Sequence, residues 1–240
     1  RPGPPGVHHT TGRTNFAVYS RQAAGMALLL YAAADDEAPF QEITLTPPAN
    51  RQAFFWHVAI EDLPPGTLYN WRVTQRTADG READFEVLDP FARAVSTCRW
   101  RRAGWRPGSP LAIRGVVTEA TDAQRPAPIG LDGAVIYELH VGGFTRHPSS
   151  GVRQPGTFSG LIEKIPYLRD LGVTHVQLLP VAAFDEQDVP ASVAALGLAN
   201  YWGYSPVALA SPHPGYATSP DPATHEDEFR AMVQAFHAAG

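Results

Sequence analysis

The hydrophobic pattern of this chain changes its period part-way along, and this change limits the folds that the chain can adopt. In residues 1–98, short runs of aromatic and β-branched residues alternate with turn sequences such as Pro64-Pro65-Gly66. Such runs are typical of antiparallel strands, and their number favours a β-sandwich of immunoglobulin-like type. The strands predicted in this part are 15–20, 26–32, 40–46, 54–60, 68–75 and 84–88.

Beyond residue 132 the pattern becomes that of alternating strands and helices. Residues 134–141 and 173–181 form nearly continuous apolar runs, which predicts strands buried on both faces. Residues 158–171 carry an apolar stripe at helical spacing, within which Pro166 should kink or divide the helix. A further amphipathic helix is predicted at 224–239. Strand, helix, strand, helix predicts parallel βα units, the first part of a (β/α)8 barrel that needs roughly 250 residues when complete.

These two patterns divide the 240 residues into three segments. Residues 1–98 are predicted to be the sandwich, 99–131 a connector with little structure of its own, and 132–240 an incomplete barrel. The connector holds Trp100 and Trp105, two large apolar side chains that need burial. We therefore expect the sandwich to pack against the outer wall of the barrel.

Charge and cysteine content narrow the class of partner. The formal net charge is −5 and no cluster of Lys or Arg occurs, which argues against a nucleic-acid surface and favours a neutral or polar substrate.

Cys98 is the only cysteine, and no apolar run resembles a membrane span or a signal peptide, so we expect a cytoplasmic protein without a membrane partner. No metal or cofactor is expected. No metal-ligand spacing occurs among His147, His175, His213 and His225, and we interpret them as structural or solvated residues.

Several long strings, in order and correctly spaced, resemble a known family. In the barrel part they resemble the isoamylase and bacterial glycogen-debranching branch of the α-amylase family, glycoside hydrolase family 13. In the first part they resemble the starch-binding-type sandwich, or carbohydrate-binding module, that precedes such barrels. The strings are TNFAVYS (14–20), LPPGTLYNWRV (63–73), VLDPFA (87–92), IYELHVGGFT (136–145), GTFSGL (156–161), IPYLRDLGVTHVQLLP (165–180), NYWGYSP (200–206), HPGY (213–216) and DEFRAMVQAFHAAG (227–240).

The resemblance implies a retaining glycosidase that hydrolyses α-1,6 branch linkages in glycogen or branched maltodextrin. It places the catalytic carboxylates after Gly240, so residues 1–240 alone are expected to be inactive and to fold only in part. Gln177 departs from the family, which usually has Glu at this point. A glucan branching enzyme and a maltooligosyl-trehalose trehalohydrolase share the same domain order and stay open as alternatives. So does a non-catalytic glucan-binding protein with a degenerate barrel. The oligomeric state stays open too.

The candidate substrate-binding residues lie mainly in the NYWGYSP string. The resemblance implies that Tyr204 stacks on the sugar ring at the scissile bond, since an aromatic ring matches the apolar C–H face of a sugar. Its neighbours Tyr201 and Trp202 are more often packing residues, and an exposed one could bind glucan. Asn200 is expected to hydrogen-bond the loop backbone rather than a sugar. His140, near the end of the first barrel strand, is expected to orient a loop.

Two glutamates and three aromatic residues could be taken for catalytic or sugar-binding residues, but structural roles explain them better. Glu138 lies in a string predicted to be a buried strand, and Glu186 lies in a loop, so pairing them as glycosidase acids is not justified. Trp56, Tyr69 and Trp71 fall in alternating strands of the sandwich, where half of the positions face the core. We expect core packing for at least two of these three rings.

Overall fold

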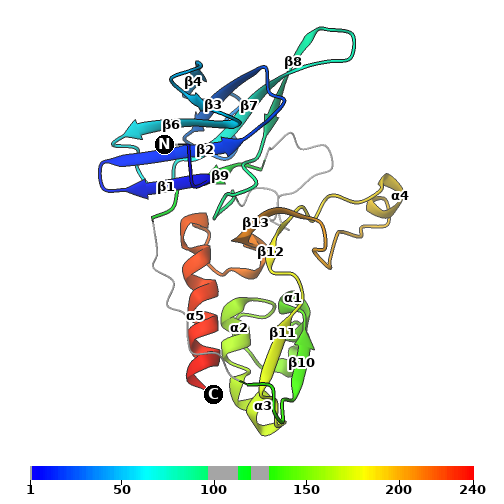
Figure 1. Ribbon diagram of the computed structural model, residues 1–240. Coiled ribbons are helices and arrows are strands. Elements are labelled where there is room, and N and C mark those ends of the chain that lie inside the picture. The colour runs from blue at the N-terminus through cyan, green and yellow to red at the C-terminus, as the bar shows by residue number, and fades with distance from the viewer. Residues whose placement is uncertain (1, 97–112, 120–129) are drawn as a thin grey trace.

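The computed structural model describes residues 2–96, 113–119 and 130–240. Figure 1 shows a β-rich half formed by the N-terminal part of the chain and, below it, a half in which strands and helices alternate. The predicted boundary at residue 98, together with Trp100 and Trp105, lies outside the described residues. Within the described parts, no helix combines the length and the apolar character that crossing a membrane requires.

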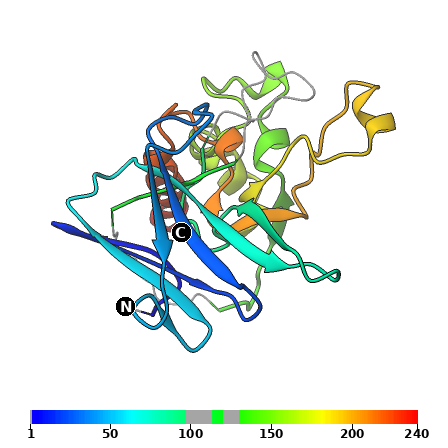
Figure 2. The same ribbon diagram turned by 90° about the horizontal axis from the view of Figure 1, so that it is seen from above.

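The first half is an antiparallel sandwich of two sheets, which Figure 2 shows from above. The first sheet has the order β1-β2-β6-β5, and the second has the order β4-β3-β7-β8 with β9 also paired to β7. All six predicted strands are present, whereas β1, β5 and β9 were not predicted. The strands are β1 (Gly6–Thr10), β2 (Arg13–Tyr19), β3 (Gly25–Tyr31), β4 (Gln41–Leu45), β5 (Arg51–Gln52), β6 (Phe55–Glu61), β7 (Leu68–Arg76), β8 (Glu82–Val87) and β9 (Gly115–Val116).

Aromatic rings fill the space between the two sheets. Phe16 on β2 meets Tyr69 and Trp71 on β7 edge-on, with ring centroids 5.1 and 6.5 Å apart. Trp56 on β6 is also buried, so all three rings weighed as glucan-stacking candidates in the sandwich belong to the core, as predicted. The buried Tyr69 hydroxyl donates to the carboxylate of Asp89 at 3.0 Å, which gives this polar group the partner that burial demands.

The predicted connector contributes to the sandwich. We expected residues 99–131 to have little structure of their own, yet β9 within this range pairs antiparallel with β7 and places Gly115 opposite Tyr69. A Cβ added at Gly115 would lie 2.6 Å from the Tyr69 ring, so only glycine allows this close approach. The chain therefore returns to the second sheet before it enters the other half.

The second half begins with a parallel strand pair joined by helices. β10 (Ile136–Leu139) pairs in parallel with β11 (His175–Leu178), and the connection carries α2 (Phe158–Ile162) and α3 (Ile165–Asp170). Pro166 lies in the first turn of α3, so it divides the predicted helix as expected. The remaining elements are α1 (Val141–Phe144), η1 (Pro148–Ser150), β12 (Ala182–Phe184), α4 (Ala191–Ala194), β13 (Pro206–Pro212), η2 (Pro214–Tyr216), η3 (Pro222–Thr224) and α5 (His225–Ala238).

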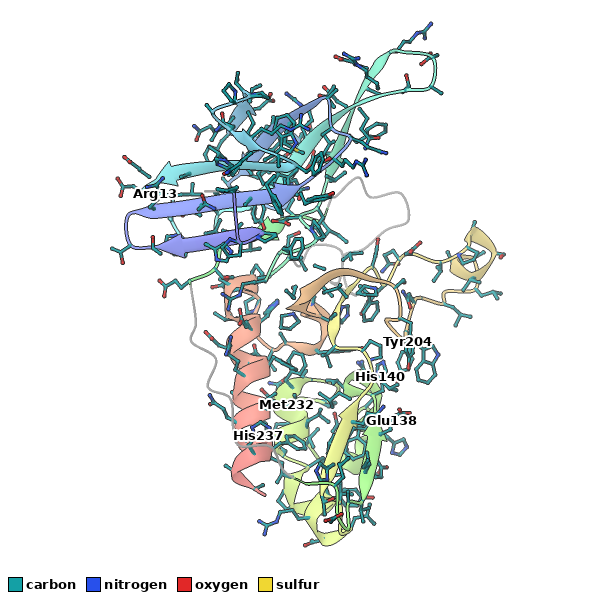
Figure 3. All side chains as sticks on the ribbon, in the orientation of Figure 1. Arg13, Glu138, His140, Tyr204, Met232 and His237 are labelled. Atoms are coloured by element: carbon teal, nitrogen blue, oxygen red, sulfur yellow. The ribbon has the colours of Figure 1, made fainter. Side chains whose placement is uncertain are left out.

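Strands β10 and β11 are less buried than their apolar runs predicted. Leu139 is buried, but Ile136 and Glu138 on β10 and Gln177 on β11 are exposed. One face of the pair packs in a core with Phe158, Leu161 and Met232. Figure 3 shows Met232 on α5, the helix that lies beside α2. The prediction of strands buried on both faces was wrong for these residues, because nothing among the described residues covers the other face.

The two halves are in direct contact. Arg93, in the segment after β8, donates to both carboxylate oxygens of Glu226 on α5, at 3.1 and 2.6 Å. Arg230 donates to the same carboxylate from one turn further along α5. Two apolar clusters support this contact: one joins Ala92 and Val95 to β12 and β13, and the other brings Ala223 of η3 against the second sheet. The sandwich therefore packs on the βα half, as expected.

Candidate functional site

The most exposed aromatic side chains of the βα half meet at a hollow near the C-terminal ends of β10 and β11. The hollow has a volume of about 680 Å³, and its lining residues are Glu138, Leu179, Asn200, Trp202, Tyr204 and Ser205. Tyr204 is 70% exposed, and Figure 3 shows it on the same side of the molecule as His140 and Glu138. The carboxyl ends of parallel strands are where α/β folds bind their ligands, so this hollow is the candidate site.

The loop that carries these aromatic residues is fixed from within. The Asn200 side chain accepts from the backbone N–H of Gly203 at 3.4 Å, and its amide donates toward Ser205 Oγ at 3.3 Å. Gly203 has φ 72°, and a Cβ there would lie 2.6 Å from the Phe184 ring, so both backbone and packing require glycine. Asn200 thus hydrogen-bonds within the loop, and it also lines the hollow.

His140 contacts the loop through a ring stack and a hydrogen bond, both to Tyr201. Its ring stacks on Tyr201, with centroids 4.2 Å apart and planes 9° apart, and its Nε2 lies 2.9 Å from the Tyr201 carbonyl oxygen. Because a carbonyl only accepts, Nε2 carries the proton and donates it. The Tyr216 hydroxyl lies 3.2 Å from the same nitrogen. The structure thus places His140 in contact with the loop and adds Tyr216, which the sequence did not single out.

Tyr201 and Trp202 have different surroundings. Tyr201 combines its stack on His140 with a hydroxyl close to Gly143, where an added Cβ would lie 2.2 Å from the Tyr201 oxygen. Trp202 meets Tyr201 edge-on at 5.2 Å and lines the hollow beside Tyr204. Tyr201 is therefore mainly a packing residue of the loop, whereas Trp202 presents a ring to the hollow.

Glu138 belongs to this hollow and not to a buried core, contrary to prediction. It lies opposite Gln177 in the β10–β11 register, and the Gln177 amide donates to its carboxylate at 3.2 Å. A glutamate at position 177 would place a second carboxylate beside that of Glu138, and the two negative charges would repel each other. The neutral amide of Gln177 instead donates a hydrogen bond to an oxygen of Glu138. Gln177 therefore gives Glu138, its partner on the neighbouring strand, a neutral hydrogen-bond donor in place of a second carboxylate.

Glu186 lines a second hollow of about 530 Å³, together with His140, Arg146 and Tyr201. Its carboxylate oxygen lies 3.2 Å from Nε2 of His213, which is fully buried and stacks on Phe184 at 3.9 Å. Glu138 and Glu186 line separate hollows, in line with the prediction that they do not form an acid pair. Within the described ranges, no group of three His, Cys, Asp or Glu is arranged to hold a metal ion.

Comparison with known proteins shows which proteins this chain resembles. Residues 4–92 match the model of carbohydrate-binding module 48, the isoamylase N-terminal domain. Isoamylase SU1 of Zea mays, a chloroplastic protein, is 34% identical over 256 aligned residues, which take in 100% of this chain and 32% of the maize protein. This chain is a homologue of the isoamylases. The chloroplastic isoamylase 1 of Oryza sativa subsp. japonica is likewise 34% identical, and the chain spans 31% of its length.

Solved pullulanases share the fold of this isoamylase homologue. The pullulanase of Paenibacillus barengoltzii, solved with maltohexaose and α-cyclodextrin, has a TM-score of 0.75 and 27% identity, covering 99% of this chain and 36% of that one. The pullulanase of Anoxybacillus sp. LM18-11, solved with maltotriose, has a TM-score of 0.73 and 28% identity, covering 99% and 33%. The chain thus spans about a third of the length of the relatives it matches.

Proposed function

We propose that these residues belong to a glycoside hydrolase that cleaves the α-1,6 branch linkages of an α-glucan such as glycogen or branched maltodextrin. The observation that carries the proposal is the exposed Tyr204 ring in a hollow at the ends of two parallel strands, in a chain that aligns over its whole length with isoamylases. Glycogen debranching is the role that follows from this chemistry.

The hollow offers the two kinds of contact that a sugar ring requires. Tyr204 and Trp202 supply apolar ring faces for the C–H faces of glucose, and the Glu138 carboxylate supplies an acceptor for its hydroxyl groups. A flat ring also tolerates the flattened sugar of an oxocarbenium-like transition state, which a close-fitting aliphatic pocket would not. Tyr204 is therefore assigned to the sugar at the scissile bond, with Trp202 beside it.

The reaction itself needs two carboxylates about 5 Å apart for retention of configuration. We propose that both follow Gly240 in the whole protein, on later strands of a (β/α)8 barrel that begins with β10 and β11. The parallel pairing of these strands, the helices between them and the uncovered face around Ile136 and Gln177 support this arrangement, because further strands would cover that face.

The assay that tests the function gives the whole protein pullulan, glycogen and unbranched amylose. A debranching hydrolase releases reducing ends from pullulan and glycogen, deepens the iodine colour of glycogen and leaves amylose intact. A branching enzyme would lower the iodine colour of amylose without releasing reducing ends, and a trehalohydrolase would release trehalose from maltooligosyl-trehalose. If the protein binds glycogen but reacts with none of these substrates, it is a non-catalytic glucan-binding protein and the proposed function is wrong.

Replacing Gly143 with alanine tests the bracing of the loop. The added methyl group meets the Tyr201 hydroxyl, so Tyr201 must move and its stack on His140 is disturbed. We expect turnover of pullulan to fall severalfold, up to about tenfold, because the platform loses its fixed orientation. The matched control is Gly130→Ala, where an added Cβ meets nothing within 4 Å. Equal turnover in the two variants would show that the stack on His140 does not position the site.

A cytoplasmic location stays part of the proposal. Its support is the single cysteine, Cys98, which allows no disulfide within the chain. The two plant relatives are described as chloroplastic, and a chloroplast is also compatible with the lack of a disulfide within these 240 residues. Fractionation of cells that express the whole protein decides between these compartments.

A further inference from the structure

A pair of polar side chains lies across the parallel strands β10 and β11, beside the hollow of Tyr204. Glu138 on β10 is opposite Gln177 on β11 in the register of the two strands. Successive side chains of a strand point to opposite faces. Because Tyr137 and Leu139 pack in the core on one face, Glu138 points to the other. Both Glu138 and Gln177 are exposed in the described part of the chain.

One hydrogen bond joins this pair. The amide nitrogen of Gln177 lies 3.2 Å from Oε2 of Glu138. A carboxylate only accepts hydrogen bonds, so the amide turns its nitrogen, and not its carbonyl oxygen, toward Glu138. Within residues 2–96, 113–119 and 130–240, Gln177 is the only side chain that hydrogen-bonds this carboxylate, and no Lys or Arg pairs with it. The orientation of the Glu138 side chain therefore depends on Gln177.

The two residues differ in their relation to the hollow. Glu138 is one of its lining residues, together with Trp202 and Tyr204, whereas Gln177 is not. Figure 3 shows Glu138 and Tyr204 on the same side of the molecule. The hydrogen bond occupies one carboxylate oxygen, Oε2, and leaves Oε1 without a partner among the described residues. Glu138 can therefore present one oxygen to the hollow while Gln177 holds the other.

We propose that Gln177 is a positioning residue of the debranching reaction. Its amide holds the Glu138 carboxylate so that this group accepts a hydrogen bond from a hydroxyl of the sugar stacked on Tyr204. An unrestrained glutamate samples several rotamers and loses that freedom when it binds a ligand. Because Gln177 orients the side chain beforehand, less freedom is lost on binding. The inference rests on the proposed function for its substrate, and it assigns a role to a residue that does not line the hollow.

Replacing Gln177 with methionine in the whole protein tests this role, because methionine keeps the length of the side chain and has no N–H to donate. The KM for pullulan and the dissociation constant for maltotriose, measured by calorimetry, should each rise about threefold to tenfold, since one intramolecular hydrogen bond is lost. The kcat should stay nearly unchanged, because the hydroxyl contact exists in both the bound substrate and the transition state. The matched control is Gln52→Met, which replaces an exposed glutamine of β5 in the sandwich and should change neither constant.

Exchanging the two residues separates positioning from a general effect on folding. Gln177→Glu alone places a second carboxylate beside Glu138 and should raise both constants at least as much as Gln177→Met does. Glu138→Gln/Gln177→Glu restores an amide and a carboxylate across the two strands, and the amide oxygen can still accept from the sugar. The double variant should therefore bind maltotriose more tightly than Gln177→Glu does. Such a rescue requires the two side chains to act as a pair.

Unchanged KM and maltotriose binding in Gln177→Met would overturn the proposal. So would a lower kcat and a lower melting temperature at constant KM, which would show a role in folding alone. If Gln177→Met does not fold, the glutamate variants decide, and a double variant that binds no better than Gln177→Glu contradicts the pairing. A parent protein that binds maltotriose but cleaves no branch refutes the proposed function, and the binding measurements still test Gln177. A parent protein that does not bind maltotriose would overturn both.

Discussion

Replacing Tyr204 with alanine is expected to lower the turnover of branched α-glucan by roughly 10- to 150-fold. The ring is 70% exposed, so its loss removes little from the folded protein itself. A sugar that covers the ring buries a surface worth about 1.5–3 kcal/mol, and each 1.36 kcal/mol lost from transition-state binding is a factor of ten in rate. The effect should appear mainly in kcat, because the platform acts most on the distorted sugar.

Two further variants show whether the ring itself is responsible. Tyr204→Phe keeps the ring and should retain most of the turnover, since only the hydroxyl is lost. Leu209→Ala is a control of similar exposure on β13 and should change neither turnover nor melting temperature. If Tyr204→Ala turns over pullulan at a near-normal rate with an unchanged melting temperature, Tyr204 does not belong to the site.

Replacing Glu226 with alanine should weaken the contact between the two halves and lower the stability of the protein. Its carboxylate accepts hydrogen bonds from Arg93 of the segment after β8 and from Arg230 of α5, and its side chain is mostly buried. Without it, the guanidinium groups of Arg93 and Arg230 lose the carboxylate that both of them bind. We expect a loss of about 2 kcal/mol, or a melting temperature lower by about 4–8 °C. Glu82→Ala is the matched control, because Glu82 pairs with Arg76 at the exposed end of β8 and should cost little.

The same contact predicts a dependence on pH. Burial alone would raise the pKa of Glu226, but hydrogen bonds and charges from Arg93 and Arg230 outweigh it and hold that pKa below its usual 4.5. A carboxyl group with a lowered pKa stabilises the folded state above its usual pKa, and the contribution is lost as the pH falls through the lowered value. The difference in melting temperature between the parent and Glu226→Ala should therefore persist at pH 7 and pH 5 and shrink below pH 4.5. A difference that grew on acidification would contradict the assignment.

Much of the sandwich could be predicted because its pattern is local. Alternation along β2, β3 and β7 placed the strands to within a few residues, and burial of Trp56, Tyr69 and Trp71 followed from their alternating positions. Pro166 divides its helix for a reason that acts within a single turn. Features of this kind depend on a few neighbouring residues, so one sequence is enough to predict them.

Features that depend on distant parts of the chain could not be predicted. The pairing of β9 with β7 joins residues that are far apart in sequence, and no local pattern in Gly115–Val116 indicates a strand. The exposure of Glu138 depends on what lies over β10, which the residues of β10 do not encode. The contact between His140 and Tyr201 likewise spans 61 positions, so the sequence indicated His140 by its place in a motif but not its partner.

The candidate site is tested most directly by a crystal structure of the whole protein with a bound malto-oligosaccharide such as maltotriose. We expect a glucose ring stacked face to face on Tyr204, with Trp202 beside it and the Glu138 carboxylate within hydrogen-bond distance of a sugar hydroxyl. A sugar bound elsewhere in the catalytic half, with the hollow of Tyr204 and Trp202 filled by another part of the protein, would contradict it.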